Sequence, residues 1–216
     1  MKLLKKEWTL CLHPAALIML GLGTLILIPN YPYTVSFFYM TLGIFFICTS
    51  GRENHDVAFT LTLPVSRRQA VAGRIGLCVC LEVLQLLLCA VFALIKTRIS
   101  TAPNEAGMDA NVALFGEGLI LFGLFNLLFF PAWYRDIRKV GVPFVKATIA
   151  VFVYIVLAIV ATYAVPFVRD QLDTPDPQHM GAKLLFLLCG LVFFLGTTLL
   201  SWRISTRRFE AQDLQL

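Results

Sequence analysis

Apolar residues gather in six long runs, and polar residues fall between them. The runs cover residues 14–28, 33–50, 73–95, 112–131, 147–167 and 184–202. A helix needs roughly 20 residues to cross a hydrocarbon core of about 30 Å, and every run except the first approaches that length. Each run is apolar on all faces, which excludes the alternating strands of a membrane barrel. The pattern predicts an all-α polytopic membrane protein with six transmembrane helices.

The connections between the runs are short. Only residues 29–32 separate the first two runs, which predicts a tight helical hairpin. Hydrophobic residues make up 58% of the 216 residues and charged residues 14%, against about 45–50% and about 25% in soluble domains. No connection is long or polar enough to fold alone. Residues 1–216 are therefore expected to form a single transmembrane domain.

Lysine and arginine are divided unequally between the two sides of this topology. The side with both termini and the segments 51–74 and 132–146 carries 14 of the 18 basic residues, and the other side carries 4. Basic residues accumulate on the cytoplasmic side of membrane proteins. Both termini are therefore predicted to be cytoplasmic. The net charge of +5 then reflects topology, and no nucleic-acid partner is expected.

Residues 1–13 precede the first run and mix apolar with basic side chains. Leu4, Trp8 and Cys11 share one helical face, away from the lysines of the segment. This arrangement favours a short N-terminal interfacial helix in contact with membrane lipid. The alternative is an ordinary basic flank of the first span.

Motifs of enzymes and metal sites are missing from the sequence. It has no HExxH, no GxSxG and no GxxxxGK[ST] phosphate loop. Five of the six cysteines lie inside apolar runs, where cysteine behaves as a small apolar residue. We therefore expect no catalytic residue, metal or cofactor in this chain. If the protein is driven by ATP, then ATP and Mg must bind to a partner subunit.

Three polar residues lie deep inside the runs: Glu82 and Gln85 in the third, and Asn126 in the fourth. An ionisable group at membrane depth is costly and usually faces a cavity or a partner. One interpretation places these residues on a transport path or at the seam of a dimer. The other is a carboxylate that is hydrogen-bonded between helices.

Three segments on the predicted cytoplasmic side carry short motifs. After the second run, acidic Glu53 precedes Leu63-Pro64-Val65-Ser66-Arg67, and residues 131–139 follow the fourth run with a Pro-x-x-aromatic-basic pattern. Residues 201–210 read Ser-x-x-x-Ser-x-x-x-aromatic-Glu. In this order, the motifs resemble ABC-2-type transporter permeases, especially bacterial peptide and toxin exporters of the phenol-soluble-modulin type. The chain departs from that pattern where residues 136–137 are Asp-Ile in place of the usual Phe-Gly.

The resemblance implies a permease subunit of an ATP-driven ABC exporter in a bacterial inner or plasma membrane. Such a subunit moves amphipathic peptides or other hydrophobic cargo, pairs with a second permease protomer as a homo- or heterodimer, and binds a cytoplasmic ABC ATPase subunit. The loop after the second run would be the coupling helix that docks into the ATPase. The residues expected to couple are Glu53, Asp56, Phe59, Leu61, Leu63, Pro64, Ser66, Arg67 and Arg68.

The residues of this loop suit that role. Pro64 should end a helix that begins near Asp56, and Ser66 should cap the next one. Phe59, Leu61 and Leu63 would form an apolar knob beside charged residues. The alternative for this loop is a plain basic connection with an interfacial helix.

Other classes of protein remain open at this stage. The membrane substrate-binding subunit of an energy-coupling-factor vitamin importer also has six spans and no ATPase of its own. A stand-alone secondary transporter or channel is another alternative, although inverted repeats and broken helices are not visible. An intramembrane enzyme has no motif in its favour.

Overall fold

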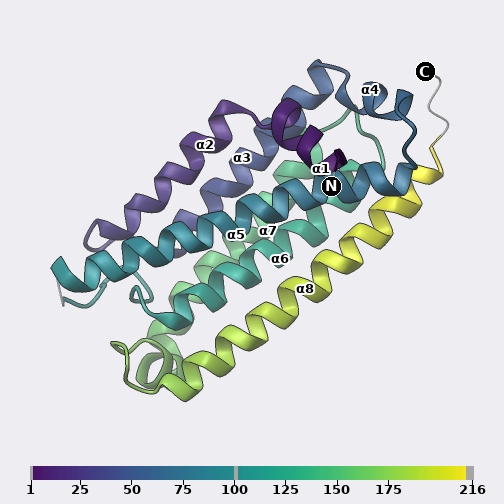
Figure 1. Cartoon of the computed structure of the whole chain (residues 1–216). Coiled ribbons are helices and arrows are strands. Elements are labelled where there is room, and N and C mark those ends of the chain that lie inside the picture. Colours follow the sequence, from purple (N-terminus) through teal and green to yellow (C-terminus); the bar gives the residue numbers. More distant parts are fainter. Residues whose placement is uncertain (1, 100–101, 213–216) are drawn as a thin grey trace.

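The protein is a bundle of helices (Figure 1). The computed structural model describes residues 2–99 and 102–212, and all regular elements among them are helical. In chain order they are α1 (Lys2–Lys6), η1 (Glu7–Cys11), α2 (Pro14–Gly21), η2 (Leu22–Leu27), α3 (Thr34–Glu53), α4 (Asp56–Thr62), α5 (Arg67–Ile99), α6 (Val112–Trp133), α7 (Gly141–Ala164), η3 (Val168–Leu172) and α8 (Met180–Glu210). The predicted all-α polytopic fold is confirmed.

Five of these helices, α3, α5, α6, α7 and α8, are long and apolar enough to cross a membrane. The sixth candidate is a bent pair, in which Leu3–Cys11 and Pro14–Leu27 meet at 86°. The first predicted run is thus α2 continued by the 3₁₀ helix η2. Together they rise about 24 Å, short of the roughly 30 Å of a hydrocarbon core.

The helices extend beyond the apolar runs. α5 begins at Arg67 instead of residue 73, and α8 continues to Glu210 instead of ending at residue 202. The 33 residues of α5 are about 50 Å long. Hydropathy marks only the part of a helix that suits lipid, whereas backbone hydrogen bonding continues into the interface. α7 is also displaced from its predicted run, to Gly141–Ala164.

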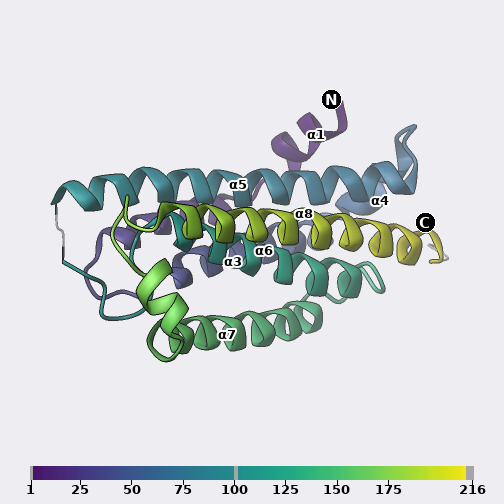
Figure 2. The same ribbon diagram turned by 90° about the horizontal axis from the view of Figure 1, so that it is seen from below.

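α1, α4 and the last turns of α8 lie toward one end of the bundle in two perpendicular views (Figures 1 and 2). The turn between α6 and α7 reaches the same end, where the Gln212 side chain donates to the Tyr134 carbonyl. The segments that connect α5 to α6 and α7 to α8 lie at the opposite end. The first of these ends, which we call the basic end, holds the segments in which 14 of the 18 basic residues were counted.

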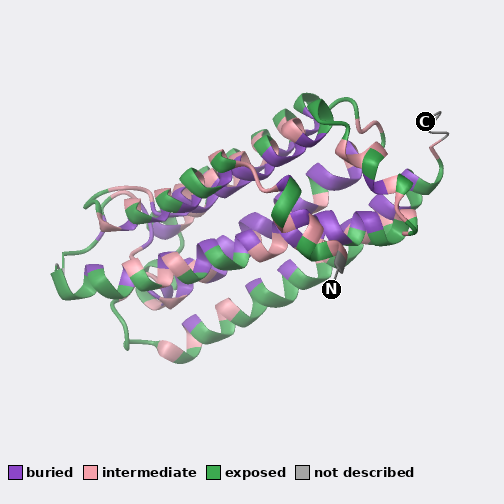
Figure 3. Cartoon of the chain, turned by 45° about the horizontal axis from the view of Figure 1, so that its top comes forward, coloured by how far each residue is buried: buried purple, intermediate pink, exposed green. Residues whose placement is uncertain are grey.

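α6 is the central helix, and it packs most closely against α8. A Cβ added to Gly190 of α8 would come within 2.7 Å of the Gly116 carbonyl oxygen on α6. Small residues allow such close approach of membrane helices. Within the span of α6, 67% of residues are buried, against 17% in each of α7 and α8. The exposed residues of α7 and α8 form apolar outer faces (Figure 3).

Candidate functional site

Helix α4 is a short element at the basic end, held between α3 and α5. His55 adopts a left-handed conformation, with φ of 52°, and turns the chain from α3 into α4. The helix ends at Thr62, before Pro64. Gln69 N donates to Ser66 Oγ at 3.2 Å, and Ser66 N donates to Gln69 Oε1 at 2.9 Å. This reciprocal capping box starts α5, with Ser66 in the predicted capping role.

A cluster of four charges fastens α4 to two other elements. Arg74 of α5 donates from Nε to Glu7 Oε2 at 2.7 Å and from Nη2 to the Asp56 carboxylate. Lys6 Nζ donates to Asp56 Oδ1 at 2.6 Å and to Glu7 Oε1 at 3.0 Å. The same ammonium donates to Thr60 Oγ1 at 2.6 Å. We call Lys6, Glu7, Asp56 and Arg74 the four-charge cluster.

The two cations and two carboxylates of the four-charge cluster compensate each other. Burial tends to raise the pKa of Asp56, but Arg74 and Lys6 outweigh it and hold that pKa below its ordinary value. Burial tends to lower the pKa of Lys6, but Asp56 and Glu7 outweigh it and raise that pKa. Asp56 and Lys6 therefore remain charged at neutral pH, so that the ion pairs persist.

Glu7, Cys11 and Asp56 also bring possible metal-ligand atoms within 4.8 Å of one another. Arg74 and Lys6 already donate to both carboxylates, and Arg74 Nη2 donates to Cys11 Sγ at 3.4 Å. The positive charge that these carboxylates require is thus supplied by the chain itself. The arrangement is that of an internal ion-pair network.

The structure separates the residues of the predicted apolar knob. Phe59 is half exposed, whereas Leu61 packs against the hydrophobic core and Leu63 is partly buried. Residues two positions apart on a helix point about 200° away from each other, so Phe59 and Leu61 of α4 occupy opposite faces. The expectation of one continuous apolar knob was therefore wrong.

The other predicted coupling residues also divide into two groups. Asp56 is paired inside the four-charge cluster. Arg67 Nη1 donates to the carbonyls of Phe209 and Gln212, at 3.1 and 2.7 Å, and also to that of Glu210 at 3.1 Å. The residues that are exposed on the surface are Glu53, Phe59, Pro64, Ser66 and Arg68.

The three motifs that were recognised in the sequence meet at the basic end. Arg67, from the first motif, caps the carboxyl end of α8, where a cation is favourable. Arg208, within the last motif, donates to the Pro131 carbonyl at 2.7 Å, and Pro131 begins the second motif. The rings of Tyr134 and Phe209 lie 5.3 Å apart. These long-range contacts were not predicted.

The N-terminal segment differs from the predicted interfacial helix, because its polar side chains contact other helices of the chain. Leu4 is exposed, as such a helix requires, but Cys11 of the same predicted face is buried, and Lys6 and Glu7 turn inward to α4 and α5. Lys6, Glu7 and Arg74 were missed as site residues. Arg74 lies within the predicted third span, and a cation there requires a buried carboxylate partner. That signal was present in the sequence.

The polar residues of the interior are enclosed by the chain itself. Asn126 Nδ2 of α6 donates to Glu82 Oε2 of α5 at 3.0 Å and to Thr198 Oγ1 of α8 at 3.2 Å. Gln85 Nε2 donates to the Ser36 carbonyl at 3.1 Å. Glu82, Gln85 and Asn126 are fully buried and do not face lipid. Their geometry matches the second interpretation from the sequence, in which a carboxylate is hydrogen-bonded between helices.

Comparison with known proteins identifies the family of the chain. The family model described as ABC-2 family transporter protein matches residues 1–210. The matched range includes every helix from α1 to α8, the four-charge cluster and all three motifs. No curated protein and no solved structure matches the chain. The chain belongs to the ABC-2 family of transporter proteins, and is thus a membrane-embedded permease subunit of an ABC transporter.

Proposed function

We propose that the chain is the permease of an ATP-driven exporter in a bacterial plasma membrane, with both termini in the cytoplasm. A cytoplasmic ABC ATPase subunit binds and hydrolyses ATP with Mg, and the permease converts its movement into transport. One observation carries this proposal: α4 exposes Phe59 while Asp56 on the same helix is bonded to Arg74 at the base of α5.

The exposed residues of α4 and its flanks form the docking surface. Phe59 enters a groove on the ATPase, with Glu53 and Arg68 beside it and Pro64 and Ser66 at the exit of the loop. Leu61 and Leu63 support this surface from beneath, because they are partly buried. Apolar anchors at the centre of an interface commonly contribute more than charges at its rim.

The four-charge cluster passes the movement of α4 to the membrane helices. Asp56 connects α4 to Arg74, and Arg74 lies two turns from the start of a helix of 33 residues. A rigid helix of about 50 Å carries a tilt at its base to its far end. Glu7 and Lys6 make the N-terminal segment follow the same movement.

The cargo is an amphipathic peptide or another hydrophobic molecule, and the path lies between two permease protomers. The apolar outer faces of α7 and α8 support this, since only 17% of each span is buried within one chain. The segments between α5 and α6 and between α7 and α8 are too short for a separate outer domain. A path bordered by apolar helices favours hydrophobic cargo over a small hydrophilic solute.

Glu82, Gln85 and Asn126 contribute a polar contact that rearranges as α5, α6 and α8 separate during transport. In the described residues, Glu82 Oε1, Gln85 Oε1 and Asn126 Oδ1 have no hydrogen-bond partner. Buried polar atoms usually have one. This incomplete pairing supports a contact that is remade in another conformation.

The test first searches the genes beside the permease gene for one that encodes a phosphate-loop ATPase. The two proteins are then co-expressed, the permease is purified, and export is assayed. The ATPase should co-purify with the permease. Deletion of the permease gene should reduce secretion of amphipathic peptides and increase sensitivity to them. Co-purification with unchanged secretion and sensitivity would contradict the cargo alone, whereas absence of the ATPase would contradict the coupling.

A further inference from the structure

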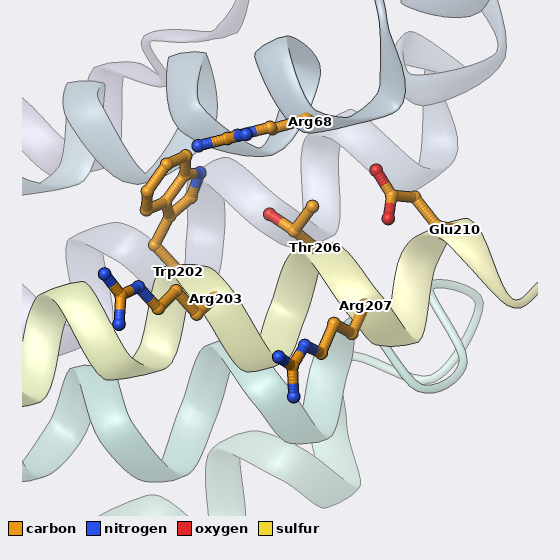
Figure 4. Close-up of a pocket in the computed structure, with 6 residues that line it drawn as sticks. All are labelled: Arg68, Trp202, Arg203, Thr206, Arg207 and Glu210. Atoms are coloured by element: carbon orange, nitrogen blue, oxygen red, sulfur yellow. The ribbon is translucent and has the colours of Figure 1, made fainter.

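A pocket of about 310 Å³ lies between α5 and α8 at the basic end (Figure 4). Arg68 comes from α5, and the remaining side chains come from the last turns of α8. The lining residues are Arg68, Trp202, Arg203, Thr206, Arg207 and Glu210. The pocket is separate from the four-charge cluster, because none of those four residues lines it.

The charge of this pocket is strongly positive. The lining holds three arginines and one carboxylate, that of Glu210. Within residues 2–99 and 102–212, the guanidinium groups of Arg68, Arg203 and Arg207 form no ion pair and donate no hydrogen bond. Those of Arg67, Arg74 and Arg208 do donate to other groups of the chain. The Arg68 guanidinium carbon lies 4.8 Å from the centre of the Trp202 ring, which holds its plane in place. The pocket therefore offers guanidinium donors that the chain itself does not use.

A buried hydroxyl adds to these donors. Thr206 is only 8% exposed, and its Oγ1 has no hydrogen-bond partner among the described residues. The hydroxyl points from α8 toward the space beneath Arg68 (Figure 4). A buried polar atom without a partner calls for an explanation, and a ligand with acceptor oxygens provides one.

The pocket lies where the apolar surface of α8 ends. Leu199 and Leu200 are exposed one turn before Trp202, and Arg203 follows directly. Tryptophan is typical of the membrane interface, and arginine extends its charged end toward the headgroups. This order of leucine, tryptophan and arginine is the one expected at the depth of lipid phosphates.

We propose that this pocket binds the phosphate of an anionic phospholipid headgroup. Guanidinium groups match phosphate oxygens with paired hydrogen bonds, and the Thr206 hydroxyl supplies a further donor. The acyl chains then lie along the exposed leucines of α8, and the headgroup connects α8 to Arg68 of α5. The leaflet involved is the cytoplasmic one under the proposed orientation, but binding itself does not depend on the transport function.

The experiment measures ligand-induced thermal stabilisation of the full-length chain in neutral detergent. The ligands are short-chain phosphatidylglycerol, short-chain phosphatidylcholine and inorganic phosphate. Phosphatidylglycerol should stabilise the chain most. The variant Arg203→Gln/Arg207→Gln should weaken its apparent affinity about 25-fold, from about fivefold for each charge. Glu210→Gln should strengthen it several-fold, because the opposing carboxylate is removed.

Arg138→Gln is the matched control, since this arginine is 87% exposed at the same end and lies outside the pocket. It should retain the affinity of the native chain. Equal stabilisation by phosphatidylcholine, or full affinity in the double arginine variant, would overturn the proposal. Equal binding of inorganic phosphate would make it a site for small anions.

Discussion

Arg74 Nε donates a hydrogen bond to Glu7 Oε2 at 2.7 Å and joins segments that are 67 residues apart in the chain. Their side chains are 4% and 2% exposed. With the partly buried Lys6 and Asp56 completing the cluster, two positive and two negative charges lie together. This pairing fastens the N-terminal segment, α4 and α5 to one another.

Replacing Arg74 with glutamine should destabilise the protein by about 3–5 kcal/mol, because Glu7 and Asp56 would keep buried charges without their main partner. Thermal unfolding in detergent measures the loss. Adding Glu7→Gln should restore part of the stability by removing one of the uncompensated charges. Arg52→Gln is the control, since its pair with Glu53 is exposed and should contribute less than about 1 kcal/mol. Equal unfolding temperatures for Arg74→Gln and the native chain would contradict this role.

Stability should fall in acid through Asp56. Its pKa is lower in the folded than in the unfolded chain, so its contribution is complete above the unfolded value of about 3.9 and is lost as the pH falls through the folded value. At pH values below about 4, the unfolding temperature of the native chain should therefore decrease. The Asp56→Asn variant should be less stable at neutral pH, and its unfolding temperature should change less as the pH falls into the acid range. Parallel curves for both proteins would argue against this ion pair.

Phe59→Ala and Leu61→Ala should have different effects. Phe59 is half exposed, so its loss should leave the unfolding temperature nearly unchanged and weaken ATPase binding by about 2 kcal/mol or more. Leu61 packs against the core, and its loss should reduce the stability of the permease itself. Co-purification and thermal unfolding separate the two effects. If the Phe59→Ala variant bound the ATPase as strongly as the native chain, the docking role would have to be assigned to the 132–146 loop instead.

Glu82→Gln should preserve the fold, because a glutamine oxygen can still accept the hydrogen bond from Asn126 Nδ2. Under the proposed function it should change transport or substrate-stimulated ATP hydrolysis. Glu82→Leu serves as the comparison, since it leaves Asn126 without this acceptor and should also destabilise the protein. Native transport and ATP hydrolysis in Glu82→Gln would reduce Glu82 to a structural contact.

The orientation of the chain can be tested with single cysteines in a variant whose native cysteines are replaced. Gln178, between η3 and α8, and Asn54, between α3 and α4, are both exposed. These two segments lie at opposite ends of the bundle (Figure 1). In intact cells, a membrane-impermeant maleimide should modify Gln178→Cys and spare Asn54→Cys. Asn54→Cys should react once the membrane is permeabilised. Labelling of Asn54→Cys in intact cells would contradict the proposed orientation and indicate the opposite one.

Local properties were readable along the chain. Insertion of a helix into lipid depends on the summed hydrophobicity of about 20 consecutive residues, so the five long spans and the unequal distribution of basic residues were visible at once. Pro64 and Ser66 predicted the end of α4 and the start of α5 for the same reason, since breaking and capping act within one helical turn. The first span was ambiguous because its run is short, and the structure shows a bent pair there.

The sequence by itself therefore determined an all-α membrane protein with an amphipathic loop at its basic end, because hydropathy, capping and charge bias act over neighbouring residues. Only the tertiary structure decided which charges are buried together and which remain free. Arg67 caps α8, Arg74 pairs with Glu7 and Asp56, and Arg68 lies beside Trp202 without an ion pair among the described residues. The three arginines look alike in the sequence, because each partner is set by which helices pack side by side, and that depends on contacts across the whole chain.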